Sequence, residues 1–353
     1  MMKLWVLGNG QLGMLMRHAG MPLGLEVVPV GIDDIGPQQL GADDLVTAER
    51  EHWPANATTN SLANHPNFAN LQTIQDLADR QLQKSKLDEL GLASSPWQPL
   101  TDSTDIDALH KALGERVLLK QRRGGYDGKG QLWLKQGEPL PSLDGWREHA
   151  IAEQGIGFSE ELSLIGARNA QGEKVFYPLV RNLHQNGILL ASQSPLPERD
   201  HLQTQAEEML GKLMDAVDYH GVMTMECFRV GEKLLINEIA TRVHNSGHWT
   251  MTGANISQFE LHLRAVAGLP LTRPVVLSPT VMINLLGVER NDQWLTVPGS
   301  HLTWYNKEVR PGRKLGHVNL VSDTPKHLRD TTAQLLTLMP ENYQAVLEWF
   351  VDH

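Results

Sequence analysis

Cysteine is almost absent from this chain of 353 residues, since Cys227 is the only one. A single cysteine forms no intramolecular disulfide and supplies no cysteine-cluster metal site. We therefore expect a protein of the reducing cytoplasm. Residues 1–7 show no basic segment followed by a long apolar one, so no signal peptide is expected.

Long hydrophobic runs and an excess of positive charge are also missing. No apolar stretch approaches the roughly 18 residues of a membrane span, so no membrane partner is expected. The 31 Lys and Arg residues are outnumbered by 41 Asp and Glu residues, which gives a net charge of −10. Proteins that bind nucleic acid usually have a basic face, so nucleic acid is not expected as a partner. An anionic small substrate must then be bound by local basic clusters.

The composition is that of a globular protein, with 41% hydrophobic and 20% charged residues, and the length predicts two or three domains. Lys3–Leu7 and Leu25–Val30 are apolar, strand-like runs. Gln11–Met21 between them has a helical spacing of apolar residues. A strand–helix–strand unit of this kind forms a parallel sheet, so residues 1–95 are expected to form one α/β domain.

The rest of the chain alternates strands and helices without an internal repeat. Asp76–Leu90 is predicted as one helix that ends at Gly91. Leu202–Val217 and Phe259–Val266 are further helices by their apolar period. The predicted strands are Val117–Lys120, Gln131–Leu134, Ala150–Gln154, Glu161–Ala167, Val175–Val180, Val222–Phe228, Leu234–Glu238 and Val281–Leu286.

A glycine-rich turn, Gly8-Asn9-Gly10-Gln11-Leu12-Gly13, follows the first strand and opens the first helix. Glycines let the backbone approach an anion at a helix N-terminus, where N–H groups are free. With Asp33 at the place of a ribose-binding acid, a nicotinamide site is one interpretation. Another phosphate ligand, or a tight turn without any ligand, explains the motif equally well.

A second glycine-rich segment, residues 120–131, holds four glycines and four basic residues between two predicted strands. It is not a P-loop, because Gly128-Lys129 is followed by glycine rather than Ser or Thr. Such a loop can fold over phosphates while Lys120 and Lys129 supply positive charge. The alternative is an ordinary solvated hairpin.

Two glutamates, Glu226 and Glu238, lie in consecutive apolar strands. If the hairpin is centred on Glu232, they are directly opposed, with Cβ atoms about 4.5–5.5 Å apart. Two carboxylates this close in an apolar sheet repel each other, and a divalent cation removes that conflict. Magnesium typically uses one or two carboxylates together with substrate phosphates, and Asn237 adds an oxygen donor nearby. The alternative is two surface glutamates paired with lysines.

The segment after Glu238 carries Arg242 and His244, whose side chains point the same way in an extended chain. Arginine is suited to bidentate binding of an oxyanion. A lone histidine is more often structural, but the position beside Glu238 favours a functional one.

The strongest basic cluster of this acidic chain is Lys307-Glu308-Val309-Arg310-Pro311-Gly312-Arg313-Lys314. A rigid Pro-Gly turn with cations on each side suits a phosphate on a small substrate. The alternative is a solvated loop.

These motifs, in this order, resemble the ATP-grasp superfamily and, within it, the 5-(carboxyamino)imidazole ribonucleotide synthases. The resemblance extends over nearly the whole chain. It implies a mixed α/β and α+β architecture with a Rossmann-like N-terminal domain, an ATP-grasp domain and a small β-rich C-terminal domain, at residues 1–95, 96–274 and 275–353. The residues that carry it are Leu7–Gly13, Gly124–Gln131, Met225–Phe228, Asn237-Glu238, Arg242–Trp249 and Arg310–His317.

The resemblance implies a site for ATP and Mg²⁺. Glu226 and Glu238 would carry the metal. The phosphates would be bound by Arg80 and Lys120 under a flap of Gly125, Tyr126, Asp127, Gly128, Lys129, Gly130 and Gln131. Adenine would lie along Glu153, Gln154, Gly155 and Ile156, the ribose would lie at Glu161, and His184, Asn237 and Glu238 would share the pocket.

The implied reaction joins bicarbonate to 5-aminoimidazole ribonucleotide at the expense of ATP, in purine synthesis. Arg242, His244 and Asn245 would stabilise carboxyphosphate, and Lys129 would add positive charge. Either Asp127 or His244 would take the proton from the amine. The ribonucleotide would be bound by Gly8, Gly10, Gln11, Leu12, Lys307, Arg313 and Lys314. The resemblance also implies a homodimer.

Three other functions compete with this one. A formate-using ribonucleotide transformylase shares the nucleotide site and differs only at the acceptor. A nicotinamide-dependent dehydrogenase uses the first glycine motif but leaves Glu226 and Glu238 unexplained. A non-catalytic nucleotide-binding regulator is the third.

Overall fold

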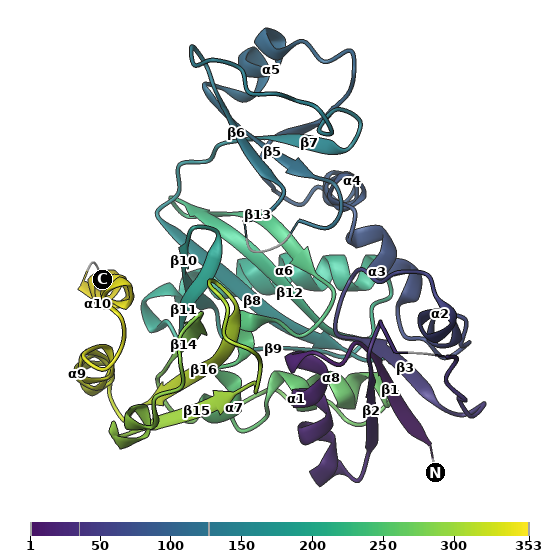
Figure 1. Ribbon diagram of the computed structural model, residues 1–353, viewed down its shortest axis with the longest axis vertical. Coiled ribbons are helices and arrows are strands. Elements are labelled where there is room, and N and C mark those ends of the chain that lie inside the picture. The colour runs from purple at the N-terminus through teal and green to yellow at the C-terminus, as the bar shows by residue number, and fades with distance from the viewer. Residues whose placement is uncertain (1, 35, 126–127, 352–353) are drawn as a thin grey trace.

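The computed structural model describes residues 2–34, 36–125 and 128–351. In Figure 1 a small sheet with α5 (Ile106–Leu113) lies at the top, a large sheet fills the centre and left, and the N-terminal sheet lies at the lower right. Among these residues, no helix combines the length and the apolar character that crossing a membrane requires.

The N-terminal sheet is parallel, with the strand order β2-β1-β3. Apolar residues of β1 are buried on both faces: Leu4 and Val6 pack with α1, and Trp5 and Leu7 pack with α2 and α3. The predicted strand–helix–strand unit is confirmed. The elements are β1 (Lys3–Leu7), α1 (Gln11–Gly20), η1 (Met21–Leu23), β2 (Glu26–Val30), β3 (Leu45–Ala48), α2 (Ala57–Ala63) and α3 (Leu71–Leu77).

The prediction of one helix over Asp76–Leu90 is wrong. The helix α3 ends at Leu77, and α4 (Arg80–Glu89) begins after Asp79. The Asp79 carboxylate accepts hydrogen bonds from the backbone N–H of Gln81 at 2.9 Å and of Leu82 at 3.4 Å, which makes it an N-cap. The break places Arg80 at the start of a helix.

The small sheet has the strand order β4-β7-β5-β6 and is antiparallel. Lys120 pairs with Gln131 at the ends of β5 and β6, so the glycine-rich segment connects two strands, as predicted. The strands are β4 (Trp97–Leu100), β5 (Arg116–Gln121), β6 (Gln131–Lys135) and β7 (Ala150–Gln154).

The large sheet has the order β13-β12-β8-β10-β11-β14-β16-β15, with β9 paired to β8. Helix α6 (Asp200–Ala216) packs with Leu162 and Leu164 of β8, while α8 (Gln258–Val266) packs with Ile165 and Ala167 on the other face. The strands are β8 (Glu160–Arg168), β9 (Lys174–Phe176), β10 (Val180–Gln185), β11 (Ile188–Ser194), β12 (Gly221–Val230), β13 (Lys233–Ala240), β14 (Thr280–Leu286), β15 (Ser300–Trp304) and β16 (Lys314–Val321).

The predicted strand Val175–Val180 is also wrong, because β9 ends at Phe176 and β10 begins at Val180. Pro178 between them has no backbone N–H to donate within a sheet. The backbone N–H of Leu179 instead donates to the Gln203 side chain at 2.8 Å.

The C-terminal part continues the large sheet. Ile283 of β14 pairs with Ala191 of β11, so strands on both sides of the predicted boundary at residue 274 belong to one sheet. The domain limits themselves stay predictions. The remaining elements are η2 (Pro197–Arg199), η3 (Asn245–Gly247), α7 (Thr250–Gly253), η4 (Asp292–Thr296), α9 (Pro325–Leu336), η5 (Glu341–Gln344) and α10 (Ala345–Val351).

Candidate active site

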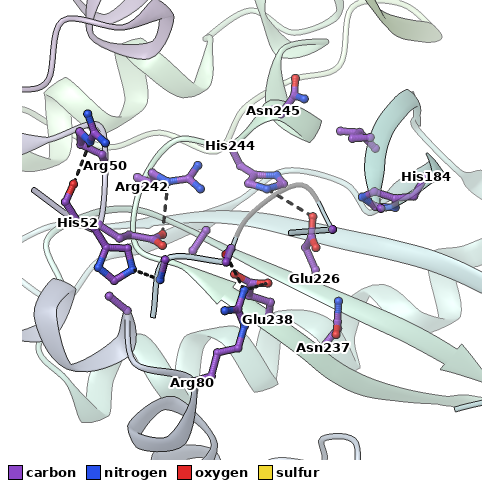
Figure 2. Close-up of a pocket in the computed structure, with 18 of the residues that line it drawn as sticks. Arg50, His52, Arg80, His184, Glu226, Asn237, Glu238, Arg242, His244 and Asn245 are labelled. Atoms are coloured by element: carbon purple, nitrogen blue, oxygen red, sulfur yellow. Dashed lines mark hydrogen bonds and ion pairs between the residues drawn. The ribbon is translucent and has the colours of Figure 1, made fainter. Parts of the chain in front are cut away.

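A cavity of about 1060 Å³ lies where the three sheets meet. Figure 2 shows its interior, with Glu226 and Glu238 below Arg242 and His244. Most of the predicted site residues line it: Gly10, Gln11, Leu12, Arg80, Lys120, Gly125, Gly128, Gln131, Glu161, His184, Glu226, Asn237, Glu238, Arg242, His244, Asn245, Lys307, Arg313 and Lys314. Tyr126 and Asp127 lie outside the described residues.

Glu226 and Glu238 are directly opposite each other on β12 and β13, as predicted. The reason differs from the prediction, since the turn is centred between Gly231 and Glu232 and not on Glu232. The register shifts beyond Cys227, which pairs with Ile236, so Asn237 is the extra residue of a β-bulge. The bulge lets Asn237 and Glu238 both line the cavity.

The carboxylate pair carries an electrostatic conflict. Burial raises the pKa of Glu226, and the carboxylates of Glu238 and Glu161 raise it further against the opposing effect of His184. His244 Nε2 lies 3.4 Å from Glu226 Oε1, and Arg80 Nη2 lies 3.5 Å from Glu238 Oε2 (Figure 2).

This donor set fits magnesium. Among the described residues no group of three or more His, Cys, Asp or Glu side chains gathers as a metal site. Two opposed carboxylates with free coordination positions are what Mg²⁺ uses when phosphates and water complete its shell. The conflict between Glu226 and Glu238 is therefore one that this ion would remove.

Lys120 is held in place by a buried ion-pair triad. Its Nζ lies 2.7 Å from Glu153 Oε2 and donates to Asn237 Oδ1 at 2.9 Å, and Lys84 Nζ lies 3.0 Å from Glu153 Oε1. All three charged side chains are at most 5% exposed. Burial opposes ionisation of Glu153, but Lys120 and Lys84 outweigh it and lower the pKa of that carboxyl. The Glu153 side chain thus contacts two lysines.

The base of the flap is bound to α4. Arg80 donates to the carbonyl oxygens of Gln121 and Gly125, both at 2.8 Å, and the Asp79 carboxylate lies 2.7 Å from Arg122 Nη2. Among the described flap residues, Lys129 and Gly130 lie beside the cavity and not in its wall. Residues 122–125 are therefore anchored from below through the start of a helix.

Arg242, His244 and Asn245 form one wall of the cavity. Arg242 Nε lies 3.4 Å from Glu51 Oε1, and burial together with the charges of Arg242 and Lys314 holds the pKa of His244 well below its ordinary value. Both polar side-chain atoms of Asn245 are buried without a hydrogen-bond partner among the described residues. Buried polar groups are normally paired, so this amide is arranged for a ligand.

Glu161 and His184 pair across β8 and β10. The distance from His184 Nδ1 to Glu161 Oε2 is 2.6 Å. Burial opposes the charged imidazole, but the hydrogen bond to Glu161 and the charge of Glu226 outweigh it and raise the pKa of His184.

The N-terminal glycine motif binds a carboxylate of the chain itself. Glu49 accepts hydrogen bonds from the backbone N–H groups of Gly10 and Gly13, both at 2.5 Å. A Cβ atom on Gly8 would lie 2.3 Å from Glu49 Cγ, so glycine is required by this approach. Gly10 lines the cavity while Gly8 lies behind it. The amides expected to bind a phosphate are thus already satisfied.

The basic tail segment meets the N-terminal domain at the cavity. Lys307 Nζ donates to Gln11 Oε1, and Arg313 donates to the carbonyl oxygen of Glu308 at 3.1 Å. Burial and the nearby charge of Arg313 lower the pKa of Lys307. Residues 296 positions apart in the chain therefore share one wall.

Known proteins are similar to this chain over nearly its whole length. The ATP-grasp domain model matches residues 85–259, and the phosphoribosylaminoimidazole carboxylase C-terminal domain model matches residues 280–331. The N5-carboxyaminoimidazole ribonucleotide synthase of Escherichia coli (strain K12) is 49% identical over 349 residues, which cover 99% of this chain and 98% of that protein. The chain belongs to the N5-carboxyaminoimidazole ribonucleotide synthase family.

Solved structures agree with this assignment. The N5-carboxyaminoimidazole ribonucleotide synthetase from Thermus thermophilus has a TM-score of 0.86 and 38% identity, over 96% of this chain and 99% of that one. The enzyme from Staphylococcus aureus complexed with ADP has a TM-score of 0.84 and 29% identity, over 95% and 96%. The predicted ATP-grasp fold and family are confirmed. The names 5-(carboxyamino)imidazole ribonucleotide synthase and N5-carboxyaminoimidazole ribonucleotide synthase denote the same family.

One apolar part of the cavity was missed in the sequence. The rings of Phe158 and Phe228 stack with centroids 4.6 Å apart and line the cavity, as Leu118 and Leu189 also do. Phe228 is two residues after Glu226 on the same strand, so alternation could have placed both on one face. None of the four residues of the predicted adenine segment, Glu153–Ile156, is in the cavity wall.

Residues 50–52 were also missed in the sequence. Arg50, Glu51 and His52 follow β3 and reach into the cavity, and His52 Nε2 accepts a hydrogen bond from the backbone N–H of Gly124 at 3.3 Å. Nothing in their local pattern signals a site, because they reach it only through packing of the N-terminal domain against the flap.

Proposed function

We infer that this chain is an ATP-dependent ligase that carboxylates 5-aminoimidazole ribonucleotide with bicarbonate. The products are 5-(carboxyamino)imidazole ribonucleotide, ADP and phosphate, in purine synthesis. The observation that carries this inference is the meeting of the Glu226–Glu238 pair with Arg242, His244 and Asn245 in one cavity. That cavity is shared with the tail cations.

The nucleotide side of the cavity suits ATP. Lys120 and Arg80 supply positive charge for the phosphates, and the stacked pair Phe158–Phe228 offers an apolar surface for a base. Glu226 and Glu238 would hold Mg²⁺ here. When bound, the ion offsets negative charge on the phosphates during phosphoryl transfer. The flap residues exclude water from the transfer.

Bicarbonate becomes reactive by phosphorylation. A bicarbonate oxygen takes the γ-phosphoryl group as its bond to ADP breaks, which gives carboxyphosphate. Carboxyphosphate releases phosphate and carbon dioxide, and the substrate amine then bonds to the carbon and loses one proton. Arg242, His244 and Asn245 offer donors for the anionic oxygens of this intermediate, beside the carboxylate pair.

The acceptor end of the cavity suits a ribonucleotide phosphate. Lys307, Arg313 and Lys314 place three cations around Gln11 and Leu12. Because Glu49 already fills the amides of Gly10 and Gly13, the tail cations carry the phosphate in this proposal and the glycine turn shapes the wall. This also removes the reason for a nicotinamide site at that turn.

We also propose a homodimer in the cytoplasm. The single buried cysteine suits a reducing compartment, and the dimer rests on the family resemblance. Light scattering would give twice the 39.3 kDa of one chain for a dimer. A measured mass equal to that of one chain would contradict the dimer.

The test is phosphate release from ATP in the presence of Mg²⁺. We expect full release only when bicarbonate and 5-aminoimidazole ribonucleotide are both present, with formation of the carbamate product. Formate in place of bicarbonate should not support it. Release that depends on formate would favour the transformylase instead, and release without any acceptor would contradict both.

A further inference from the structure

A chain of hydrogen bonds runs from the interior of the large sheet to His244. Ser192 Oγ donates to Asn182 Oδ1 at 2.8 Å, and Asn182 Nδ2 donates to Ser163 Oγ at 2.9 Å. Ser163 Oγ donates to Ser246 Oγ at 2.9 Å, and Ser246 Oγ lies 2.9 Å from His244 Nδ1. We refer to these four side chains, Ser192, Asn182, Ser163 and Ser246, as the serine relay.

The serine relay is fully enclosed. Ser163, Ser192 and Ser246 are 0% exposed, and Asn182 is 4% exposed. Its members come from β8, β10, β11 and η3, so no single turn or helix cap accounts for it. Ser163 is directly opposite Glu226 in the pairing of β8 with β12, which places the relay on the same face of the sheet as the carboxylate pair. The proposed mechanism so far makes no use of it.

The relay has one direction. The side-chain amide nitrogen of Asn182 can only donate, so the Ser163 hydroxyl accepts from it, and this hydroxyl in turn donates a hydrogen bond to Ser246 Oγ. A second donor, the backbone N–H of Ser246, also points at His244 Nδ1, at 3.2 Å. A backbone N–H cannot accept. Both contacts therefore require a lone pair on Nδ1, and in a neutral imidazole the proton must then be on Nε2.

The protonated nitrogen faces the cavity. His244 Nε2 lies 3.4 Å from Glu226 Oε1, among the residues that surround the bicarbonate site (Figure 2). With Nδ1 taken by two donors and Nε2 carrying a proton, this imidazole has no lone pair to offer to a substrate amine. It has one N–H to offer to an anionic oxygen.

We propose that Ser246, Ser163 and Asn182 are positioning residues that hold His244 in its Nε2–H tautomer. His244 then donates a hydrogen bond to an oxygen of carboxyphosphate and does not take the amine proton. This proposal rests on the function inferred above. The sequence left two residues, Asp127 and His244, as the base that takes the proton from the amine. This proposal excludes His244 from that role.

The first test exchanges His244 for two amides of different reach. In His244→Gln the amide N–H₂ can take the position of Nε2, whereas in His244→Asn it reaches only the position of Nδ1. We expect bicarbonate-dependent phosphate release to be about tenfold higher in the glutamine variant, the ratio that one hydrogen bond gives. Equal losses in the two variants would overturn the donor role.

The second test removes links of the relay. We expect Ser246→Ala to raise the KM for bicarbonate about tenfold, with a smaller rise for Ser163→Ala and no change in the KM for ATP. The matched control is Ser194→Ala, which removes an equally buried hydroxyl of β11 that bonds the Leu179 carbonyl outside the relay. If Ser246→Ala behaves like Ser194→Ala, the relay has no positioning role.

The tautomer can be observed directly. Long-range ¹H–¹⁵N spectra of protein with ¹⁵N-labelled histidine distinguish the two neutral tautomers, and the His244 signals are those missing in His244→Gln. We expect Nε2–H in the wild type, and in Ser246→Ala, where only the backbone N–H of residue 246 still donates to Nδ1, a measurable fraction of the Nδ1–H form. An Nδ1–H form in the wild type would overturn the inference even in a fully active enzyme. Absence of bicarbonate-dependent turnover would instead contradict the function and leave this measurement standing.

Discussion

Glu226 and Glu238 lie directly opposite each other on β12 and β13, and burial beside like charge raises the pKa of Glu226. The bulge at Asn237 on β13 lets Glu238 line the cavity beside Glu226. In the free protein the two carboxylates oppose each other. A bound cation is held by both carboxylates. Neutralising one of them should therefore weaken the binding of the cation without destabilising the free protein.

Glu226→Gln is predicted to abolish the rise in melting temperature that Mg²⁺ with ADP gives, while the free protein unfolds at the same or a higher temperature. The amide keeps the shape of the side chain, removes the repulsion and no longer offers a charged ligand to the metal. Thermal unfolding with and without Mg²⁺ and ADP measures both effects. Glu232→Gln, at an exposed glutamate of the same hairpin, serves as the control.

Retention of the magnesium response in Glu226→Gln would remove this residue from the metal site. A large drop in the melting temperature of the free protein would mean that the carboxylate has a structural role.

Much of this hairpin was accessible from the sequence, because it is local. Two apolar strands with one turn between them predict their own pairing, and Glu226 and Glu238 are only twelve positions apart. The bulge at Asn237 was not accessible, since nothing in the alternation of side chains marks which strand holds an extra residue. The prediction of the pair survived a wrong turn centre only because the bulge shifts the register.

Lys84→Met is predicted to lower the free energy of unfolding by about 1–3 kcal/mol, since it leaves Glu153 Oε1 buried without its partner while Lys120 still neutralises the carboxylate. The KM for ATP should rise as well, because Glu153 also holds Lys120. Urea unfolding and steady-state kinetics measure these effects. Lys86→Met on the same helix, at a side chain that is 34% exposed, should change neither.

The double variant Lys84→Met with Glu153→Gln gives the sharper comparison. If the two side chains act as one pair, their combined loss of stability should be smaller than the sum of the two single losses, while Lys120 loses its buried partner and the KM for ATP stays high. Additive losses of stability would show that Lys84 and Glu153 do not act as a pair.

His262 predicts a loss of stability in mild acid. Its Nδ1 accepts a hydrogen bond from the backbone N–H of Val222 at 3.0 Å, its Nε2 lies 2.9 Å from Thr47 Oγ1, and burial lowers its pKa from 6.5 to about 4. The unfolded chain takes up the proton near pH 6.5, but the folded chain does not. The contribution is therefore present above pH 6.5 and is lost as the pH falls from there toward 4.

Between pH 7 and pH 4.5 this difference amounts to roughly 2–3 kcal/mol. The loss should be smaller by that amount in His262→Gln, which cannot titrate, and unchanged in His301→Gln at an exposed histidine. Urea unfolding at several pH values measures it. Equal pH dependence of His262→Gln and the wild type would contradict the assignment.

Arg242→Ala is predicted to lower bicarbonate-dependent turnover by about 10²–10³-fold while ADP binds with wild-type affinity, because its guanidinium lies on the bicarbonate wall beside Glu51. Phosphate release and titration with ADP measure the two properties separately. Arg290→Ala, at an exposed arginine, controls for the loss of one positive charge. An equal loss of ADP affinity would refute this division between the two halves of the cavity.

The contacts of the site between residues far apart in the chain could not be predicted from the sequence. The glycine motif correctly predicted a tight turn between a strand and a helix. However, the backbone amides of this turn that were expected to bind an external anion donate instead to the carboxylate of Glu49. Lys84 and Glu153 are 69 positions apart and meet only because α4 packs against β7. The break between α3 and α4 was missed because the cap of Asp79 outweighs a continuous helical composition.

The pairing of β14 with β11 joins the ATP-grasp strands and the C-terminal strands into one sheet. A chain shortened at residue 274 would leave β11 as a long, apolar edge with unsatisfied backbone groups, which is a template for association with other chains. The last 79 residues thus cover the edge of β11 in the large sheet. Gene fusions, insertions or proteolytic cuts near this boundary should produce aggregation before they produce a loss of nucleotide binding.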